Sequence, residues 1–188
     1  MDVLQTMNTP RRVVVTGYGA VTPLGMNTSE SWAAIMDYKL GYRYCDKSAA
    51  GIKSRFYGLI DEEPSLKGVP AAIRRRLPRY ARLTLAAARE AMQMAFGDDT
   101  PEQHYDLRDC GVIMGTGWAG QDETQLYYDD YQRTGVGSPF GCFFSMPNAS
   151  TAAVSLLMGW MVRLMSCYSS GRLRARPARP RSGLRRVG

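Results

Sequence analysis

The chain has 188 residues, of which 45% are hydrophobic, 10% aromatic and 22% charged. This composition predicts a folded globular protein with one sizeable core and excludes a fibrous or wholly disordered chain. Eight of the 24 basic residues and none of the 17 acidic ones follow Met161, so the net charge of +7 and any attraction for nucleic acid or anionic membranes belong to the last 26 residues.

His104 is the only histidine, and a site that needs two imidazoles from one chain is therefore excluded. The four cysteines (Cys45, Cys110, Cys142 and Cys167) form no Cys-x-x-Cys pair, which excludes a zinc knuckle and favours reduced thiols. The N-terminus has no basic-then-apolar leader, and no apolar run reaches the ~20 residues of a membrane span. We therefore predict a cytoplasmic protein without a membrane span, metal or cofactor.

Residues 13–15 are three valines directly before a turn rich in glycine and proline. A β-branched run with apolar residues on both faces predicts a buried central strand. Asn27 precedes Glu30 by three residues, the spacing of a capping box, and predicts the start of a helix. The apolar face of this helix is predicted to hold Trp32, Ile35 and Met36.

The middle of the chain predicts a short strand within residues 52–60 and a helical region from Pro70, broken at Pro78 and ended by Gly97. Residues 110–116 repeat the pattern of an apolar strand followed by glycines, and a helix follows over 121–134. A Pro-Asn turn, with Asn148 or Ser150 as the cap, then starts an alanine-rich buried helix. The repeated strand-loop-helix order favours a parallel or mixed α/β sheet.

Three features allow a functional and a structural interpretation. Glycines after both predicted strands are typical of phosphate loops, but neither set has the required spacing, so close packing of strand against helix is favoured. His104 lies in a polar connector and is expected to be a solvated surface residue. Three tyrosines and two aspartates between 127 and 131 predict one amphipathic helix with an acidic outer face, whose aromatics are also suited to an interface.

The opening "RRVVVTGYGAVTPLG" resembles the N-terminal signature of the β-ketoacyl-acyl-carrier-protein synthases, the elongating condensing enzymes of fatty-acid synthesis. The resemblance continues in order through "SWAAIMDYKLGYR", "FYGLI", "YARLTLAAAREAM", "GVIMGTGWAGQDET" and "SMPNASTAAVSLLMG". It covers Arg11 to Gly159 and implies an incomplete N-terminal half of a thiolase-like α/β fold, with a mixed sheet and flanking helices.

The resemblance also implies where a nucleophilic cysteine belongs, about a dozen residues beyond Gly159 at the start of a buried helix. That position holds Gly171. Cys167 lies about four residues early and lacks the family's Thr-Ala-Cys context, so it is interpreted as a plain thiol. The two histidines and the lysine that complete the family's site belong to the second half, and no catalytic residue is predicted in this chain.

Residues 160–188 are predicted to form an Arg-rich, disordered tail after a flexible N-terminus (1–10) and a partial thiolase-like domain (11–159). The codons of Gly159-Trp160-Met161-Val162, read in a shifted frame, encode Gly-Leu-Asp-Gly as one reading, the family's pattern at this point. We hypothesise that the tail is out of frame from about Met158. Resequencing the locus tests this, because a missing second-half reading frame downstream would count against it.

The predicted function is that of a truncated β-ketoacyl-ACP synthase, inactive as this chain. Its relatives condense an acyl thioester with malonyl-acyl carrier protein, which makes carrier protein and acyl thioesters the implied partners. The family's dimerisation through this half implies an oligomer with apolar surface exposed. Two alternatives remain: a non-catalytic partner of an intact synthase or of acyl carrier protein, and, ranked last, a nucleic-acid binder acting through its arginines.

Overall fold

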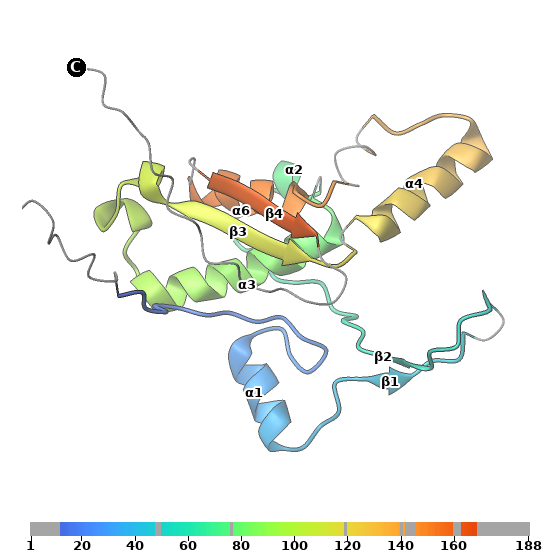
Figure 1. Cartoon of the computed structure of the whole chain (residues 1–188), viewed down its shortest axis with the longest axis horizontal. Coiled ribbons are helices and arrows are strands. Elements are labelled where there is room, and N and C mark those ends of the chain that lie inside the picture. Colours follow the sequence, from blue (N-terminus) through green and yellow to red (C-terminus); the bar gives the residue numbers. More distant parts are fainter. Residues whose placement is uncertain are drawn as a thin grey trace, which may run out of the picture.

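The computed structural model describes residues 12–47, 50–75, 77–118, 120–139, 141 and 146–159, together with the backbone of 163–168. Its centre is a pair of parallel strands, β3 (Gly111–Thr116) and β4 (Arg163–Tyr168), joined in register from Gly111 opposite Arg163 to Thr116 opposite Tyr168. Helices α3 (Arg79–Phe96) and α6 (Ala149–Met158) pack against each other, and α6 also contacts both strands (Figure 1).

The hydrophobic core lies between these elements. Leu85 of α3, Val112 of β3, Val154 of α6 and Leu66 of the preceding loop are buried and in contact. Leu85 is wholly inaccessible to water. The core is thus built by one helix face, one strand and the alanine-rich helix that the sequence predicts as buried.

The predicted helix breaks are confirmed. Helix α2 (Ala71–Arg74) ends before Pro78, and α3 runs from Arg79 to Phe96, where Gly97 adopts a positive φ of 61°. Proline lacks the N–H that continues a helix, and glycine tolerates the left-handed backbone at a helix end. Helix α4 (Gln121–Thr134) likewise ends at Gly135, with φ of 70°.

Helix α1 (Thr28–Met36) begins where predicted, but it buries a different face. The side chain of Asn27 accepts a hydrogen bond from the N–H of Glu30 at 2.8 Å, as a capping residue does. The predicted apolar face is wrong, since Trp32, Ile35 and Met36 are exposed and the buried residues are Ser31 and Ala34. The hydroxyl of Ser31 lies 2.8 Å from that of Thr22, so small residues face the neighbouring turn.

The predicted buried strand at residues 13–15 is also wrong. Val13, Val14 and Val15 are 91%, 62% and 85% exposed and form no strand. A cavity of about 360 Å³, lined by Thr16 and Gly17 and by Cys110 and Gly111, lies where the valine segment approaches β3 without joining it. A strand needs a hydrogen-bonded neighbour, and β-branched residues alone do not supply one.

In place of the expected mixed sheet, the described strands form two separate two-stranded sheets, one parallel and one antiparallel. Besides the parallel pair, β1 (Arg43–Tyr44) and β2 (Phe56–Tyr57) form a short antiparallel ribbon, which includes the predicted strand at 52–60. The prediction of disorder from residue 160 is wrong for 163–168, which form β4. The remainder of the predicted tail and residues 1–10 lie outside the described residues.

Candidate functional site

The candidate site is the end of the parallel strand pair where both strands finish. Thr116 and Tyr168 are the last residues of β3 and β4 and lie opposite each other. Gly117 and the exposed Trp118 continue from β3. In parallel α/β sheets the loops at the carboxyl ends of the strands carry the functional groups. We call this region, Thr116–Trp118 with the end of β4, the carboxyl edge.

The position expected to hold a nucleophile comes shortly after β4 in the sequence. Gly171 follows the end of β4 by three residues and lies outside the described residues. The backbone of Cys167 is in β4, opposite Gly115. Its interpretation as a plain thiol therefore stays a prediction, as does the absence of catalytic residues.

Two carboxylates lie in the first turn of α4, which begins five residues after Thr116. The Oε1 atom of Glu123 accepts a hydrogen bond from the backbone N–H of Arg79 at 2.8 Å. This bond caps α3, whose own N-cap residue, Pro78, supplies no side-chain bond. Glu123 thereby joins α4 to the body of the molecule.

The environment of Glu123 favours its protonated form. Burial raises the pKa of Glu123 to about 7, and the hydrogen bond with Asp122 adds to the rise. The same hydrogen bond lowers the pKa of Asp122. A carboxyl group whose pKa lies near neutral pH is able to give or take protons there.

Sequence reasoning missed this pair because it considered only Asp129 and Asp130 of this helix and placed them on a solvated outer face. Glu123, Tyr127 and Asp130 are instead partly buried, while Tyr128 and Tyr131 are exposed. The available signal was the position of Asp122 and Glu123 directly after a strand and a glycine loop. That position places both carboxylates in the first turn of a helix.

Tyr80 connects the start of α3 to the segment before α6. Its hydroxyl donates a hydrogen bond to the carbonyl of Met146 at 2.6 Å. Burial raises the pKa of Tyr80 to about 12, with the charges of Glu123 and Asp122 as further causes. The phenol therefore stays protonated and acts as a structural donor beside the carboxylate pair.

The glycines of the first turn are packing residues, as predicted. A Cβ at Gly17 or Gly19 would lie 2.1 Å from the carbonyl oxygen of Ala91 or Ala87 in α3. The space that a phosphate loop would offer to a ligand is filled by helix backbone. The alanines of α3 permit this close approach.

Glu90 is a second residue that sequence reasoning missed. Its two carboxylate oxygens accept hydrogen bonds from the backbone N–H groups of Ala20 at 2.9 Å and Thr28 at 2.8 Å. One side chain of α3 thus holds both ends of the glycine turn. The N–H of Thr28 is unpaired within α1, so a carboxylate there also favours the helix.

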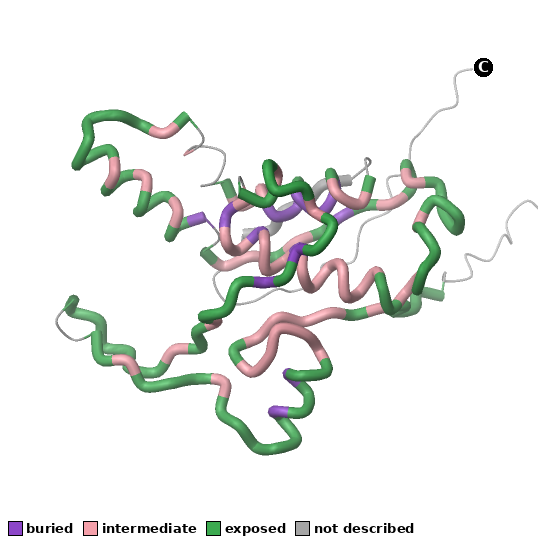
Figure 2. The backbone as a smooth tube through the Cα atoms, turned by 180° about the vertical axis from the view of Figure 1, so that it is seen from behind, coloured by how far each residue is buried: buried purple, intermediate pink, exposed green. Residues whose placement is uncertain are grey.

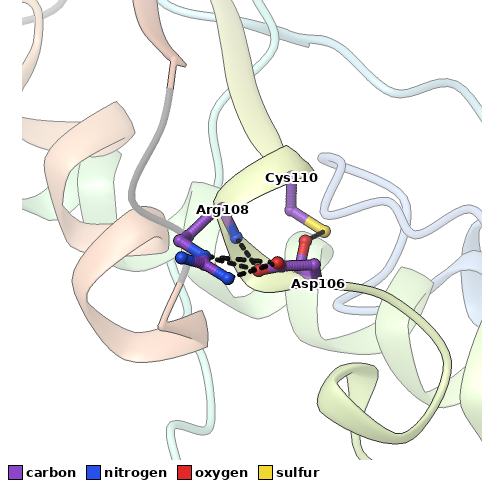
Figure 3. Close-up of polar contacts among 3 residues, drawn as sticks. All are labelled: Asp106, Arg108 and Cys110. Carbon is purple, nitrogen blue, oxygen red and sulfur yellow. Dashed lines mark hydrogen bonds and ion pairs between the residues drawn. The ribbon is translucent and has the colours of Figure 1, made fainter.

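His104 and Cys110 lie near the opposite end of β3. His104 is 44% exposed, consistent with the predicted surface position, but it has a partner, since its Nε2 lies 2.9 Å from a carboxylate oxygen of Asp99. Figure 3 shows that Cys110 directs its thiol to the carbonyl of Asp106, at 3.7 Å, while Arg108 binds the Asp106 carboxylate. Burial raises the pKa of Cys110, which disfavours the reactive thiolate.

Other potential sites are separate from the carboxyl edge. A cavity of about 450 Å³ lies among the turn at Thr22–Met26, helix α1 and the segment Leu59–Glu62.

Among the described residues, no group of three or more His, Cys, Asp or Glu side chains is arranged to hold a metal ion. No helix in the described part is long and apolar enough to cross a membrane.

The arrangement of two parallel strands, a helix after each glycine loop and a buried helix before the second strand is matched by known proteins. A family model described as the N-terminal domain of beta-ketoacyl synthases matches residues 10–175. The chain belongs to this family. The match runs past Gly159, where the sequence resemblance was predicted to end.

Curated relatives of this ketosynthase domain include the chloroplastic 3-oxoacyl-[acyl-carrier-protein] synthase II of Arabidopsis thaliana, 24% identical over 156 residues. This match covers 80% of the chain and 28% of the relative. The 3-oxoacyl-[acyl-carrier-protein] synthase 2 of Staphylococcus aureus is 25% identical over 171 residues, covering 81% of the chain and 37% of the relative. The chain thus spans about a third of the length of these relatives.

A solved structure shares the ketosynthase fold. It contains a type II polyketide synthase acyl-carrier protein in complex with its ketosynthase, AntDE:AntF, bound to the hexaketide. The TM-score is 0.61 at 20% sequence identity, and the match covers 83% of this chain and 42% of that one. The predicted α/β, thiolase-like fold class is confirmed.

Proposed function

We propose that this chain is the N-terminal domain of a condensing enzyme of fatty-acid synthesis. The family match over residues 10–175 carries the proposal, and the 3-oxoacyl-ACP synthases of Arabidopsis and S. aureus support the fatty-acid context. The polyketide ketosynthase with the same fold favours polyketide synthesis as the alternative. In either case the family's reaction joins an acyl thioester to malonyl-acyl carrier protein with release of carbon dioxide.

The 188 residues by themselves are proposed to be inactive in this reaction. The only histidine is hydrogen-bonded to Asp99 near the amino end of β3, away from the carboxyl edge. Glycine occupies position 171, where the resemblance expects the nucleophile. Covalent catalysis needs an activated nucleophile and a proton acceptor together.

Condensation of malonyl-acyl carrier protein tests this part of the proposal. The purified chain, a Cys167→Ala variant and a Cys45→Ala control are compared under identical conditions. No activity above background is expected in any of them. Activity that is lost in the Cys167→Ala variant and kept in the control would overturn the proposal and make Cys167 a displaced nucleophile.

The second candidate function is non-catalytic binding of acyl carrier protein. Arg74 and Arg75, at the end of α2, are both exposed, and the carrier proteins of this family are acidic. Two exposed guanidinium groups on consecutive residues favour association with an acidic partner.

Charge reversal tests the binding. The double variant Arg74→Glu/Arg75→Glu is expected to bind fatty-acid acyl carrier protein about tenfold more weakly than the wild type. The control Lys53→Glu/Arg55→Glu changes the net charge equally on a different exposed segment. Equal weakening in both double variants would show that net charge, and not this site, determines the binding. Tighter binding of a polyketide carrier protein than of the fatty-acid carrier protein would favour a role in polyketide synthesis.

The third part of the proposal is association with a second copy or with an intact synthase. The exposed valines at 13–15 and the exposed Trp32 and Met36 of α1 form apolar surface that a protein in solution tends to cover. Light scattering of the purified chain measures the oligomer, and a monomer at all concentrations would contradict self-association. Co-purification with an intact synthase measures the other partner.

A further inference from the structure

Helix α4 extends away from the body with most of its surface free. None of its residues, all of which are described, is buried. Figure 2 shows the helix projecting from the body, with most of its residues coloured green for exposed. Its exposed residues include Asp122, Gln125, Leu126, Tyr128 and Asp129, which we together call the outer face of α4.

The outer face combines negative charge with apolar surface. Helix α4 contains four carboxylates and a single cation, Arg133. Leu126 and Tyr128 are 68% and 57% exposed. Such a face favours a cationic partner that also stacks on an aromatic ring, and guanidinium groups do both. It disfavours the same face of a second copy, which carries like charge.

The chain itself contains a segment of this chemistry. Residues 172–186, which we call the Arg-rich segment, contain seven arginines and no acidic residue. Its attraction to carboxylates depends on charge alone and is independent of how the sequence arose.

The topology brings the two together. Strand β4 ends at Tyr168, opposite Thr116, and α4 begins at Gln121, five residues after Thr116. Figure 1 shows both strand arrows pointing toward the end of the sheet from which α4 departs. The 14 residues of α4 span about 21 Å. The residues after Tyr168 reach up to about 70 Å when extended, enough to cover the helix.

We propose that the Arg-rich segment docks on the outer face of α4 of the same chain. Its arginines pair with Asp122 and Asp129 and stack on Tyr128. Asp129 already accepts a hydrogen bond from the Gln125 amide at 2.7 Å, and its other lone pairs remain available to a guanidinium. Docking neutralises the acidic helix and covers exposed leucine and tyrosine.

Trypsin measures the docking directly, because it cleaves the Arg181–Ser182 bond of an accessible segment. The full chain, a free peptide of residues 169–188, and the variants Asp129→Lys and Asp98→Lys are digested at the same salt concentration. Asp98 is an exposed aspartate outside α4, so both variants change the net charge equally. The wild type and the Asp98→Lys control are expected to be cleaved about two- to fivefold more slowly than the peptide and the Asp129→Lys variant.

Equal cleavage of the wild type and the free peptide would overturn the proposal. Protection that falls on dilution would also overturn it, because the segment would then occupy a second copy. A short DNA duplex provides the remaining test. Docking predicts tighter duplex binding by Asp129→Lys than by Asp98→Lys, whereas equal binding by the two variants would mean that the segment is free for nucleic acid.

Discussion

The partly buried carboxyl of Glu123 predicts a dependence of stability on pH. Its Oε1 accepts a hydrogen bond from the N–H of Arg79 at 2.8 Å, and burial raises its pKa from an ordinary 4.5 to about 7. The folded chain therefore holds a proton that the unfolded chain releases between these two pH values. Because the folded state binds more protons in that window, the free energy of unfolding falls as the pH rises through it.

Replacing Glu123 by glutamine isolates this effect. A pKa difference of this size is worth about 3 kcal/mol for an enclosed carboxyl, but the side chain keeps contact with water and about 1 kcal/mol is expected. The glutamine oxygen still accepts from the N–H of Arg79, and the side chain carries no charge. Glu123→Gln should therefore be about 1 kcal/mol more stable than the wild type at pH 8 and equally stable at pH 4.

Urea denaturation followed by circular dichroism at both pH values measures the difference. Glu102→Gln is the control, because Glu102 is an exposed glutamate on the short helix Pro101–Gln103. A stability difference between Glu123→Gln and the wild type that is the same at pH 4 and pH 8 would refute the reasoning. It would show that burial at this position does not penalise the ionised carboxyl.

Three further predictions concern packing and hydrogen bonding. Gly19→Ala should lower the free energy of unfolding by about 1–3 kcal/mol, because its Cβ would lie 2.1 Å from a carbonyl of α3. Gly117→Ala, whose Cβ would meet nothing within 4 Å, should change the free energy of unfolding little. Equal urea midpoints for Gly19→Ala and Gly117→Ala would contradict close packing at Gly19. Leu85→Ala should cost about 2–5 kcal/mol and Leu156→Ala, at 73% exposure, far less; similar losses would argue against the core placed around α3. Glu90→Ala should speed hydrogen exchange at the amides of Ala20 and Thr28, which unchanged rates would disprove.

The candidate site was only partly predictable. The sequence resemblance pointed to the region after β4, and the register of Thr116 with Tyr168 places that region at the carboxyl edge. The position of Glu123 in the first turn of a helix was predictable, but the hydrogen-bond partners of Glu90 and Glu123 were not, because these are backbone groups 44 to 70 residues away. From the neighbouring residues in the sequence, both glutamates would be expected to be exposed carboxylates on a helix.

Local features were determined by the sequence itself. Asn27 caps α1, Pro78 and Gly97 bound α3, and the glycines after residues 13–15 pack on alanines. These features depend on backbone geometry and on contacts within a turn or at one point of close approach. The residue types alone specify both.

Tertiary structure decided which segments pair and which faces are covered. The three valines at 13–15 are strong strand formers and yet remain exposed. Residues 163–168, which were expected to be disordered, form β4. Strand formation needs a partner edge, and burial needs a neighbouring element; neither is contained in the segment itself. The same reason explains why Trp32 is exposed and why the pKa of Glu123 is raised. Long-range packing leaves Trp32 uncovered and buries part of the Glu123 carboxyl.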